Sequence, residues 1–156
     1  MTSNNSHRLI ITTARNRGRS TKAQQQALID SKNLLIEVSD DFIDFADCFK
    51  NDLPVVCEIG FGNGDCLCEL ARLHPDYNFL GIDIYLPGIG AALVKVKALG
   101  LSNIRVIHAD ARQVWPFLKN NSLYRIHVLF SDPWPKKRNY KRRLIQEKQL
   151  CDWLDK

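Results

Sequence analysis

The sequence lacks any apolar run long enough to cross a membrane, and it does not begin with a charged-then-apolar signal segment. It contains five cysteines, an odd number, and no two of them have the C-x-x-C spacing of many zinc and redox sites. We therefore expect neither a disulfide framework nor a metal site. We expect a cytoplasmic protein that does not associate with membranes, and nothing in the sequence indicates its oligomeric state.

Acidic residues are missing from residues 1–22, which contain four arginines and one lysine. This segment has little apolar surface, so we expect a flexible basic arm. Residues 23–54 are acidic and contain scattered apolar side chains, which predicts a helical segment ahead of the main domain. A second basic cluster, with six basic residues in eight, covers residues 136–143. Both clusters are suited to contact phosphate groups.

Strands and helices are expected to alternate from residue 55 onward, because short apolar runs are followed by glycine-rich turns and helical patterns. The expected strands are residues 55–60, 78–84, 104–108 and 126–130, and the expected helices are residues 65–74, 88–99 and 111–118. This alternation predicts an α/β fold with about four parallel strands and flanking helices, a Rossmann-like sheet over residues 55–156.

Four carboxylates fall at or beside the ends of these strands: Glu58, Asp83, Asp110 and Asp132. Each alone could be a turn residue or a helix cap. In a parallel sheet, however, the carboxyl ends of the strands lie along one edge, where ligands bind. We expect the four carboxylates to mark such a site.

A glycine-rich turn follows the first strand and contains Gly60, Gly62 and Gly64. Glycines there let a ligand approach the backbone at the start of a helix. The spacing does not fit the dinucleotide fingerprint, and the acids Glu58 and Asp65 would repel a pyrophosphate. The turn therefore favours a zwitterionic or cationic ligand over NAD, although an NAD-type oxidoreductase remains an alternative.

Asp83 stands at the end of the second strand, where an acid can accept both hydroxyls of a ribose. Asp110 and Ala111 stand after the third strand, where an adenine ring would lie. With the glycine-rich turn, this arrangement resembles the class I, Rossmann-like methyltransferases that bind S-adenosylmethionine.

The segment Phe130-Ser-Asp-Pro-Trp-Pro-Lys-Lys-Arg138, with Lys-Arg-Arg soon after it, makes the resemblance more specific. It resembles the signature of the bacterial tRNA (guanine-N7)-methyltransferase family, which modifies guanine 46 in the tRNA variable loop. Residues 17–24, 58–64 and 100–111 agree with the same family.

The family resemblance implies roles for particular residues. Glu58, Asp83, Asp110 and Asp132 would contact S-adenosylmethionine, and Asp132 would also be the active-site acid. Lys136 would contact the substrate, and the RNA would meet the basic residues Arg138, Lys141, Arg142 and Arg143. We further expect Trp134 to stack on a splayed guanine, the alternative being a rigid proline turn whose tryptophan fills the core.

The sequence departs from the family pattern at Ser131, where proline is usual, at Asp83, where glutamate is usual, and at Asn139-Tyr140, where His-Asn is usual. It ends within the helix expected after the fourth strand, so the last strands of the family's sheet are expected to be missing and the fourth strand to be an exposed edge with an uncovered apolar face. A non-catalytic RNA-binding or partner module of the same ancestry is therefore the alternative function.

Overall fold

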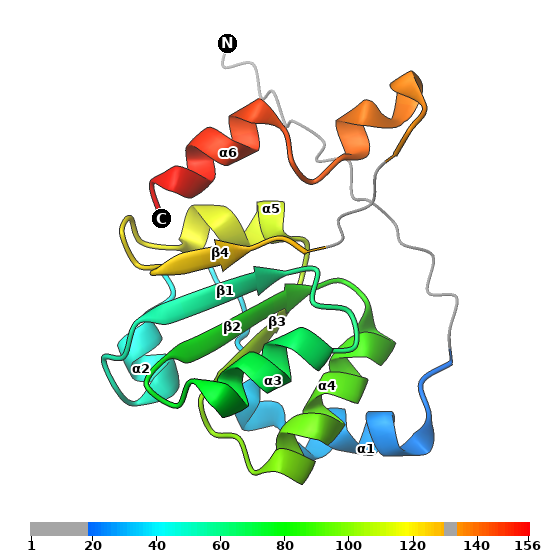
Figure 1. Ribbon diagram of the computed structural model, residues 1–156, viewed down its shortest axis with the longest axis vertical. Coiled ribbons are helices and arrows are strands. Elements are labelled where there is room, and N and C mark those ends of the chain that lie inside the picture. Colours follow the sequence, from blue (N-terminus) through cyan, green and yellow to red (C-terminus); the bar gives the residue numbers. More distant parts are fainter. Residues whose placement is uncertain (1–18, 130–133) are drawn as a thin grey trace.

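The computed structural model describes residues 19–129 and 134–156, and it contains a single parallel sheet. The strands are β1 (Val55–Ile59), β2 (Asn78–Asp83), β3 (Ile104–His108) and β4 (Arg125–His127). They lie in the order β3-β2-β1-β4, and every pairing is parallel (Figure 1). The predicted α/β fold with four parallel strands is confirmed.

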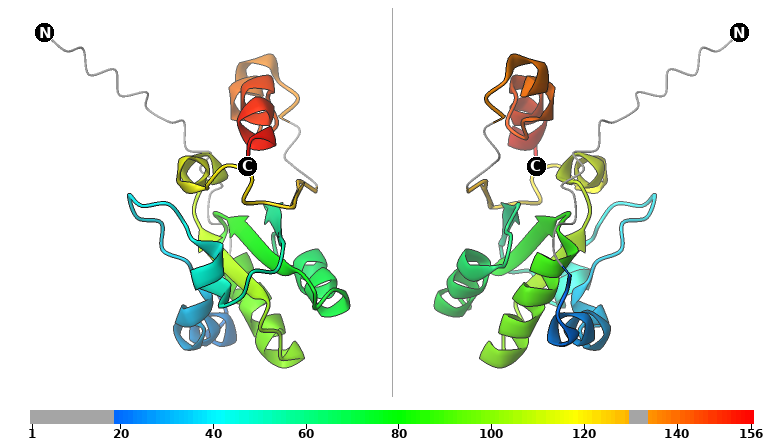
Figure 2. Two further views of the ribbon diagram at one scale, coloured as in Figure 1. Left: turned by 90° about the vertical axis from the view of Figure 1, so that its left-hand side faces the viewer. Right: turned by 90° about the vertical axis from the view of Figure 1, so that its right-hand side faces the viewer.

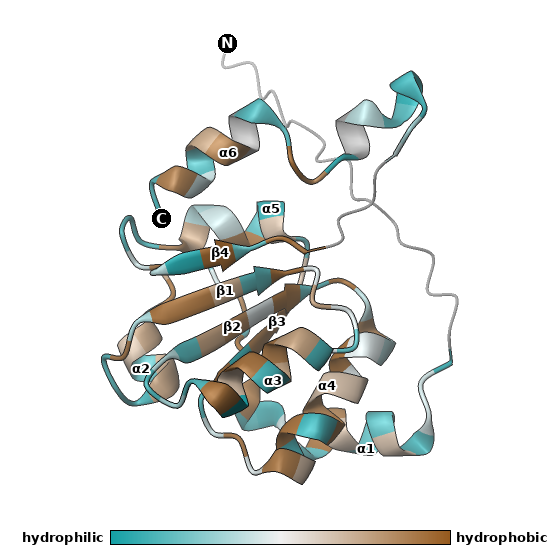
Figure 3. Cartoon of the chain, in the orientation of Figure 1, coloured by the Kyte–Doolittle hydropathy of each residue, from teal (hydrophilic) through white to brown (hydrophobic). Residues whose placement is uncertain are grey.

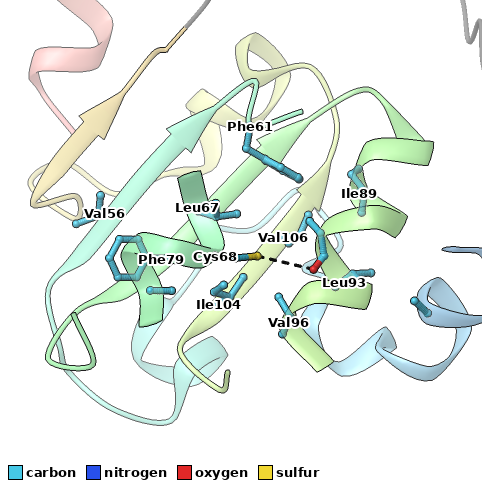
Figure 4. Close-up of a cluster of buried hydrophobic side chains, with 13 residues drawn as sticks. Val56, Phe61, Leu67, Cys68, Phe79, Ile89, Leu93, Val96, Ile104 and Val106 are labelled. Atoms are coloured by element: carbon cyan, nitrogen blue, oxygen red, sulfur yellow. Dashed lines mark hydrogen bonds between the residues drawn. The ribbon is translucent and has the colours of Figure 1, made fainter. Parts of the chain in front are cut away.

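Three helices cover one face of the sheet. They are α1 (Lys22–Asp30), α3 (Asp65–Leu73) and α4 (Leu86–Leu99). α3 and α4 lie against the strands, and α1 packs against α4 (Figures 1 and 2). Their apolar side chains form one buried cluster with Val56, Phe79, Ile104 and Val106 from the strands (Figure 4).

The opposite face is covered by shorter elements. They are α2 (Phe45–Phe49), α5 (Ala111–Val114), the 3-10 helix η2 (Trp115–Phe117) and α6 (Glu147–Leu154). The rings of Trp115 and Trp153 lie 5.3 Å apart between centroids in this second core. Ile126 and Val128, on and just after β4, are partly buried against it. The expectation that β4 would have an uncovered apolar face is therefore wrong in part, because α6 folds back over the same core.

The first 54 residues are tied to this sheet where they are described. A further 3-10 helix, η1 (Lys32–Leu34), follows α1, and isolated β-bridges join Leu35 to Val106 and Ile43 to Leu118. Residues 1–18 of the expected basic arm lie outside the described residues. Across the described ranges, every helix is too short or too polar to traverse a bilayer.

The alternation of side-chain directions along β1 determines on which face of the sheet its acidic residue, Glu58, lies. Val55, Cys57 and Ile59 belong to the core on the α5 side, whereas Val56 belongs to the core on the α3 side. Because successive side chains of a strand point to opposite faces, Glu58 points to the same side as Val56. The sheet therefore directs the Glu58 carboxylate toward α3.

Candidate cofactor site and basic segment

Glu58 is a buried carboxylate, only 4% exposed, at the carboxyl end of β1. Within the described part of the chain, its Oε2 atom has no hydrogen-bond partner. Burial, with a smaller contribution from the Asp83 carboxylate, raises the pKa of Glu58 to about 7, although the nearby Cys66 thiol acts to lower it. A buried, unsatisfied oxygen of this kind is suited to receive a cation or a hydrogen-bond donor.

The glycine-rich turn after β1 has a backbone that only glycine adopts easily. Gly60, Gly62 and Gly64 have φ values of 72°, 58° and 73°. A Cβ atom at Gly60 or Gly62 would meet nothing within 4 Å, so this side of the turn is open. A Cβ atom at Gly64 would instead collide with Ala92 of α4. The turn is thus open toward a ligand and closed against α4.

Asp83, the last residue of β2, organises this turn. Its Oδ2 atom accepts a 2.8 Å hydrogen bond from the Gly62 amide, and its Oδ1 atom accepts one of 2.8 Å from the Tyr85 amide. The Gly60 amide donates to the Ile82 carbonyl at 2.8 Å. Each carboxylate oxygen has a second lone pair, so Asp83 can hold the turn and still accept from a ligand hydroxyl.

Lys95 on α4 also braces the turn, and we did not predict it from the sequence. Its Nζ atom donates to the Asn63 carbonyl at 2.9 Å and forms an ion pair with Asp65. This pairing offsets the Asp65 charge, which was expected to repel phosphate. In the sequence, Lys95 is noticeable only as a cation in an otherwise largely apolar helix. No spacing rule connects such a lysine to a loop that lies 30 residues earlier.

The Asp110 carboxylate is bound by the nearby Arg112. Asp110 is the N-cap of α5, accepting from the Arg112 amide at 3.0 Å, and it accepts from Arg112 Nε at 2.9 Å. The hydrogen bond that Arg112 donates to the Asp110 carboxylate raises the pKa of Arg112. Arg112 was missed as well, because an arginine two residues after a cap has no distinctive sequence signature. Ala111 is buried at the first position of α5.

The structure thus brings together Glu58, the glycine-rich turn and Asp83, with Asp110 after the neighbouring strand β3. An unpaired buried carboxylate, an open glycine backbone and a strand-end acid suit a ligand that carries a cation and vicinal hydroxyls, as S-adenosylmethionine does. The individual ligand contacts stay predictions. Asp132 lies outside the described residues. No group of three or more potential metal ligands occurs among the residues that the structure describes.

The basic segment lies beyond the β4 edge of the sheet, in the 3-10 helix η3 (Lys137–Arg142) and its flanks (Figures 1 and 3). Lys136 and Arg138 are exposed. Arg143 donates from Nη2 to the Trp134 carbonyl at 3.2 Å, and its guanidinium lies 3.7 Å from the Tyr140 ring centroid. Arg143 therefore helps to shape the segment. The side chains of Lys141 and Arg142 lie outside the described part.

Trp134, the first described residue after position 129, has an unusual backbone for a tryptophan. Its φ is 38°, and its side chain is half-buried. It is absent from both buried core clusters. Stacking of Trp134 on a guanine stays a prediction.

Comparison with known proteins supplies the family. The family model described as "Putative methyltransferase" matches residues 52–156. A tRNA (guanine-N(7)-)-methyltransferase of Nitrosococcus oceani is 46% identical over 141 residues, which covers 89% of this chain and 60% of that protein. Proteins of the same name from Vibrio cholerae and Klebsiella pneumoniae are each 42% identical over 134 residues, covering 85% of this chain and 56% of theirs.

A solved structure described as "Structure of an Antibiotic Related Methyltransferase" is 26% identical, with a TM-score of 0.49, and the match covers 67% of this chain and 52% of that one. The chain spans 56–60% of the length of the three relatives named above. The family model matches well over half of the chain, and the relatives are those expected from residues 130–143. This chain therefore belongs to the methyltransferase family that includes the tRNA (guanine-N7)-methyltransferases.

Proposed function

We propose that this chain binds S-adenosylmethionine and serves a tRNA methyltransferase that transfers the methyl group to N7 of guanine 46 in the variable loop. The observation that carries the proposal is the Glu58 carboxylate, which is buried and has an unpaired oxygen beside the open glycine-rich turn. Membership of the family and the names of the relatives support the choice of reaction and substrate.

The cofactor would be held by the carboxyl ends of the first three strands. Glu58 would receive the cationic amino group, because a buried carboxylate gains most from a paired charge. Asp83 would accept the ribose hydroxyls while it holds the Gly62 amide. Asp110 and Ala111 would border the adenine, with Asp110 fixed by Arg112.

The reaction needs little acid–base chemistry. The N7 lone pair of guanine attacks the methyl carbon, the N–C bond forms, and the S–C bond breaks with its electron pair retained by sulfur. No proton is removed from N7, so no general base is required, and the positive charge passes to the base. The rate would come from in-line positioning and from a carboxylate near the new charge, a role that we assign to Asp132.

The tRNA would be held by Lys136, by Arg138 and by the other basic residues of the segment, with Trp134 stacking on the target base. If five or six phosphates are neutralised, a plot of log affinity against log salt should have a slope of about −4 to −5. A slope near zero would exclude the basic surfaces as the binding site.

Transfer of labelled methyl from S-adenosylmethionine to unmodified tRNA, followed by base analysis for 7-methylguanine, tests this proposal in the chain itself. Labelled 7-methylguanine is the expected product. Cofactor binding without product would favour the non-catalytic module. The absence of both binding and transfer would contradict the proposal.

A further inference from the structure

We propose that His127 is a further cofactor-binding residue, whose imidazole accepts a hydrogen bond from the ligand's ammonium group beside the Glu58 carboxylate. This inference rests on the proposed cofactor function and adds to it a residue that was not predicted from the sequence. His127 is the last residue of β4 and is partly buried. It therefore lies at the same edge of the sheet as the glycine-rich turn.

The strand register places His127 directly beside Glu58. The two residues are partners in the parallel pairing of β4 with β1 (Figure 1). Ile126 and Val128 belong to the core on the α5 side of the sheet. Because successive side chains of a strand alternate, His127 points to the α3 side, as Glu58 does. Neighbouring strands lie about 4.8 Å apart, so the imidazole and the carboxylate line the same small part of this face.

The neighbour of Glu58 on its other side is apolar. Its register partner on β2 is Gly81, and a Cβ atom there would collide with the side chains of Phe61 and Leu67. These two side chains fill the space over Gly81, which has no polar side chain of its own. His127 is therefore the register partner of Glu58 that carries a hydrogen-bonding side chain.

The imidazole is suited to accept a hydrogen bond. Burial, with a smaller contribution from the nearby Arg125, lowers the pKa of His127, so its ring is mostly neutral at pH 7.5. One nitrogen of a neutral imidazole is an acceptor, and an ammonium group has three donors. One donor can go to this nitrogen and another to Oε2 of Glu58, which has no partner among the described residues. Glu58 would thus supply the charge and His127 a second acceptor.

The ends of both strands are accessible to a ligand. Leu129, two residues after His127, is 37% exposed. A Cβ atom at Gly60 or Gly62, just after β1, would meet nothing within 4 Å. A ligand that lies on the glycine-rich turn can therefore bring its ammonium group to the carboxyl ends of β1 and β4.

The first test measures the affinity for two ligands by calorimetry at pH 7.5. They are S-adenosylhomocysteine and its deamino analogue, which differs from it only in lacking the amino group. His127→Leu should bind S-adenosylhomocysteine about two- to tenfold more weakly, as the loss of one hydrogen bond implies, and should bind the analogue as wild type does. His127→Asn, which keeps an acceptor, should lose less affinity. His74, exposed at the end of α3 away from the turn, supplies the matched control, because His74→Leu should change neither affinity.

Two results of this test would overturn the proposal while the cofactor function stands. Equal losses of affinity for the two ligands in His127→Leu would show that the residue only shapes the site. Unchanged affinity for both ligands would show that it makes no contact with the ammonium group. If wild type binds neither ligand, the cofactor proposal itself fails, and the assignment of His127 fails with it.

The second test takes its signal from wild type, so it does not depend on the folding of a variant. The imidazole nitrogens of protein labelled with nitrogen-15 histidine are followed by NMR, and the His127 signals are assigned with His127→Asn. Saturating S-adenosylhomocysteine should shift the signal of the accepting nitrogen, and the deamino analogue should shift it much less. A signal that does not move, or that moves equally with both ligands, would contradict the proposed contact.

Discussion

At the scale of single residues, the buried Glu58 carboxylate lowers the stability of the fold but is suited to bind a cation. A carboxylate that is 4% exposed with one unpaired oxygen destabilises the folded protein when it is ionised. The same oxygen can be satisfied by a ligand cation. Such a residue is more useful for binding than for stability, as is common at functional sites.

The raised pKa of Glu58 predicts how stability depends on pH. Between its ordinary value of 4.5 and about 7, the folded protein holds a proton on Glu58 that the unfolded chain has lost. Unfolding therefore releases a proton, and the free energy of unfolding should fall as pH rises through this window, by at most about 3 kcal/mol from this group. Above pH 7 this contribution should be constant.

Urea unfolding of wild type and Glu58→Gln between pH 4.5 and 8 measures this effect. The variant should lose less stability than wild type as pH rises. The lowered pKa of His127 makes the free energy of unfolding rise with pH in both proteins. The quantity to compare is therefore the difference in stability between wild type and Glu58→Gln at each pH. Parallel pH curves would show that Glu58 is ionised to the same extent in the folded and unfolded states.

Residue identity alone predicted part of this site. Glu58, Gly60, Gly62 and Asp83 were predicted because a strand end and a glycine turn are visible in the sequence. The bond from Lys95 to the turn depends on a distance across the fold, for which the sequence has no spacing rule. Such contacts follow only from the positions of α3 and α4.

At the scale of elements, the glycine-rich turn is held from behind by α4. A Cβ atom at Gly88 would collide with the Gly62 carbonyl oxygen and with the Tyr85 ring. Gly88 therefore lets the first turn of α4 contact the backbone of the glycine-rich turn. The geometry of the turn depends on this helix as much as on its own glycines.

Gly88→Ala should therefore displace the turn and weaken S-adenosylhomocysteine binding at least tenfold, with an overpacking cost of about 1–3 kcal/mol in stability. Gly90→Ala is the matched control, because its Cβ atom would meet Gln24 of α1 and not the turn. Gly90→Ala should reduce the free energy of unfolding by a similar amount. It should leave the affinity unchanged in calorimetry under conditions in which both variants are fully folded. Equal losses of affinity in both variants would show that α4 acts through global stability alone.

The element boundaries were predicted well where local chemistry sets them. β3 is as predicted, and α4 ends at Gly100, which takes the left-handed conformation expected of a helix stop. The helix predicted for residues 111–118 is divided into α5 and η2, because Pro116 lacks the amide that would continue the α-helical ladder.

β4 was the least well predicted strand. It spans Arg125–His127 instead of residues 126–130. Its extent is set by pairing with Val56, Cys57 and Glu58 on β1, which the sequence of residues 126–130 does not show. Phe130 lies outside the described residues.

At the scale of the whole molecule, α6 closes the second core. Trp153 is 5% exposed against Trp115, whose Nε1 atom donates to the Asp152 carbonyl at 3.2 Å. Lys156 Nζ donates to the Leu118 carbonyl at 2.6 Å. The last residues of the chain thus contribute to its folded core.

Trp153→Ala should cost about 3–5 kcal/mol in the free energy of unfolding, as expected for a buried tryptophan. Leu154→Ala is the matched control, because Leu154 is 85% exposed, and its effect should stay within about 0.5 kcal/mol. Chemical denaturation followed by circular dichroism provides the measurement. If both variants are as stable as wild type, α6 does not pack against the core in solution.

The most direct test of the account is the heat of S-adenosylmethionine binding at pH 6.5, measured in two buffers with different ionisation enthalpies. Glu58 is largely protonated at this pH in the unliganded protein, and a bound cation would ionise it. We predict binding to one site with release of a fraction of a proton, and Glu58→Gln should bind at least tenfold more weakly without that release. Absence of binding, or binding by both proteins with the same proton balance, would contradict the assignment of Glu58 to the cofactor.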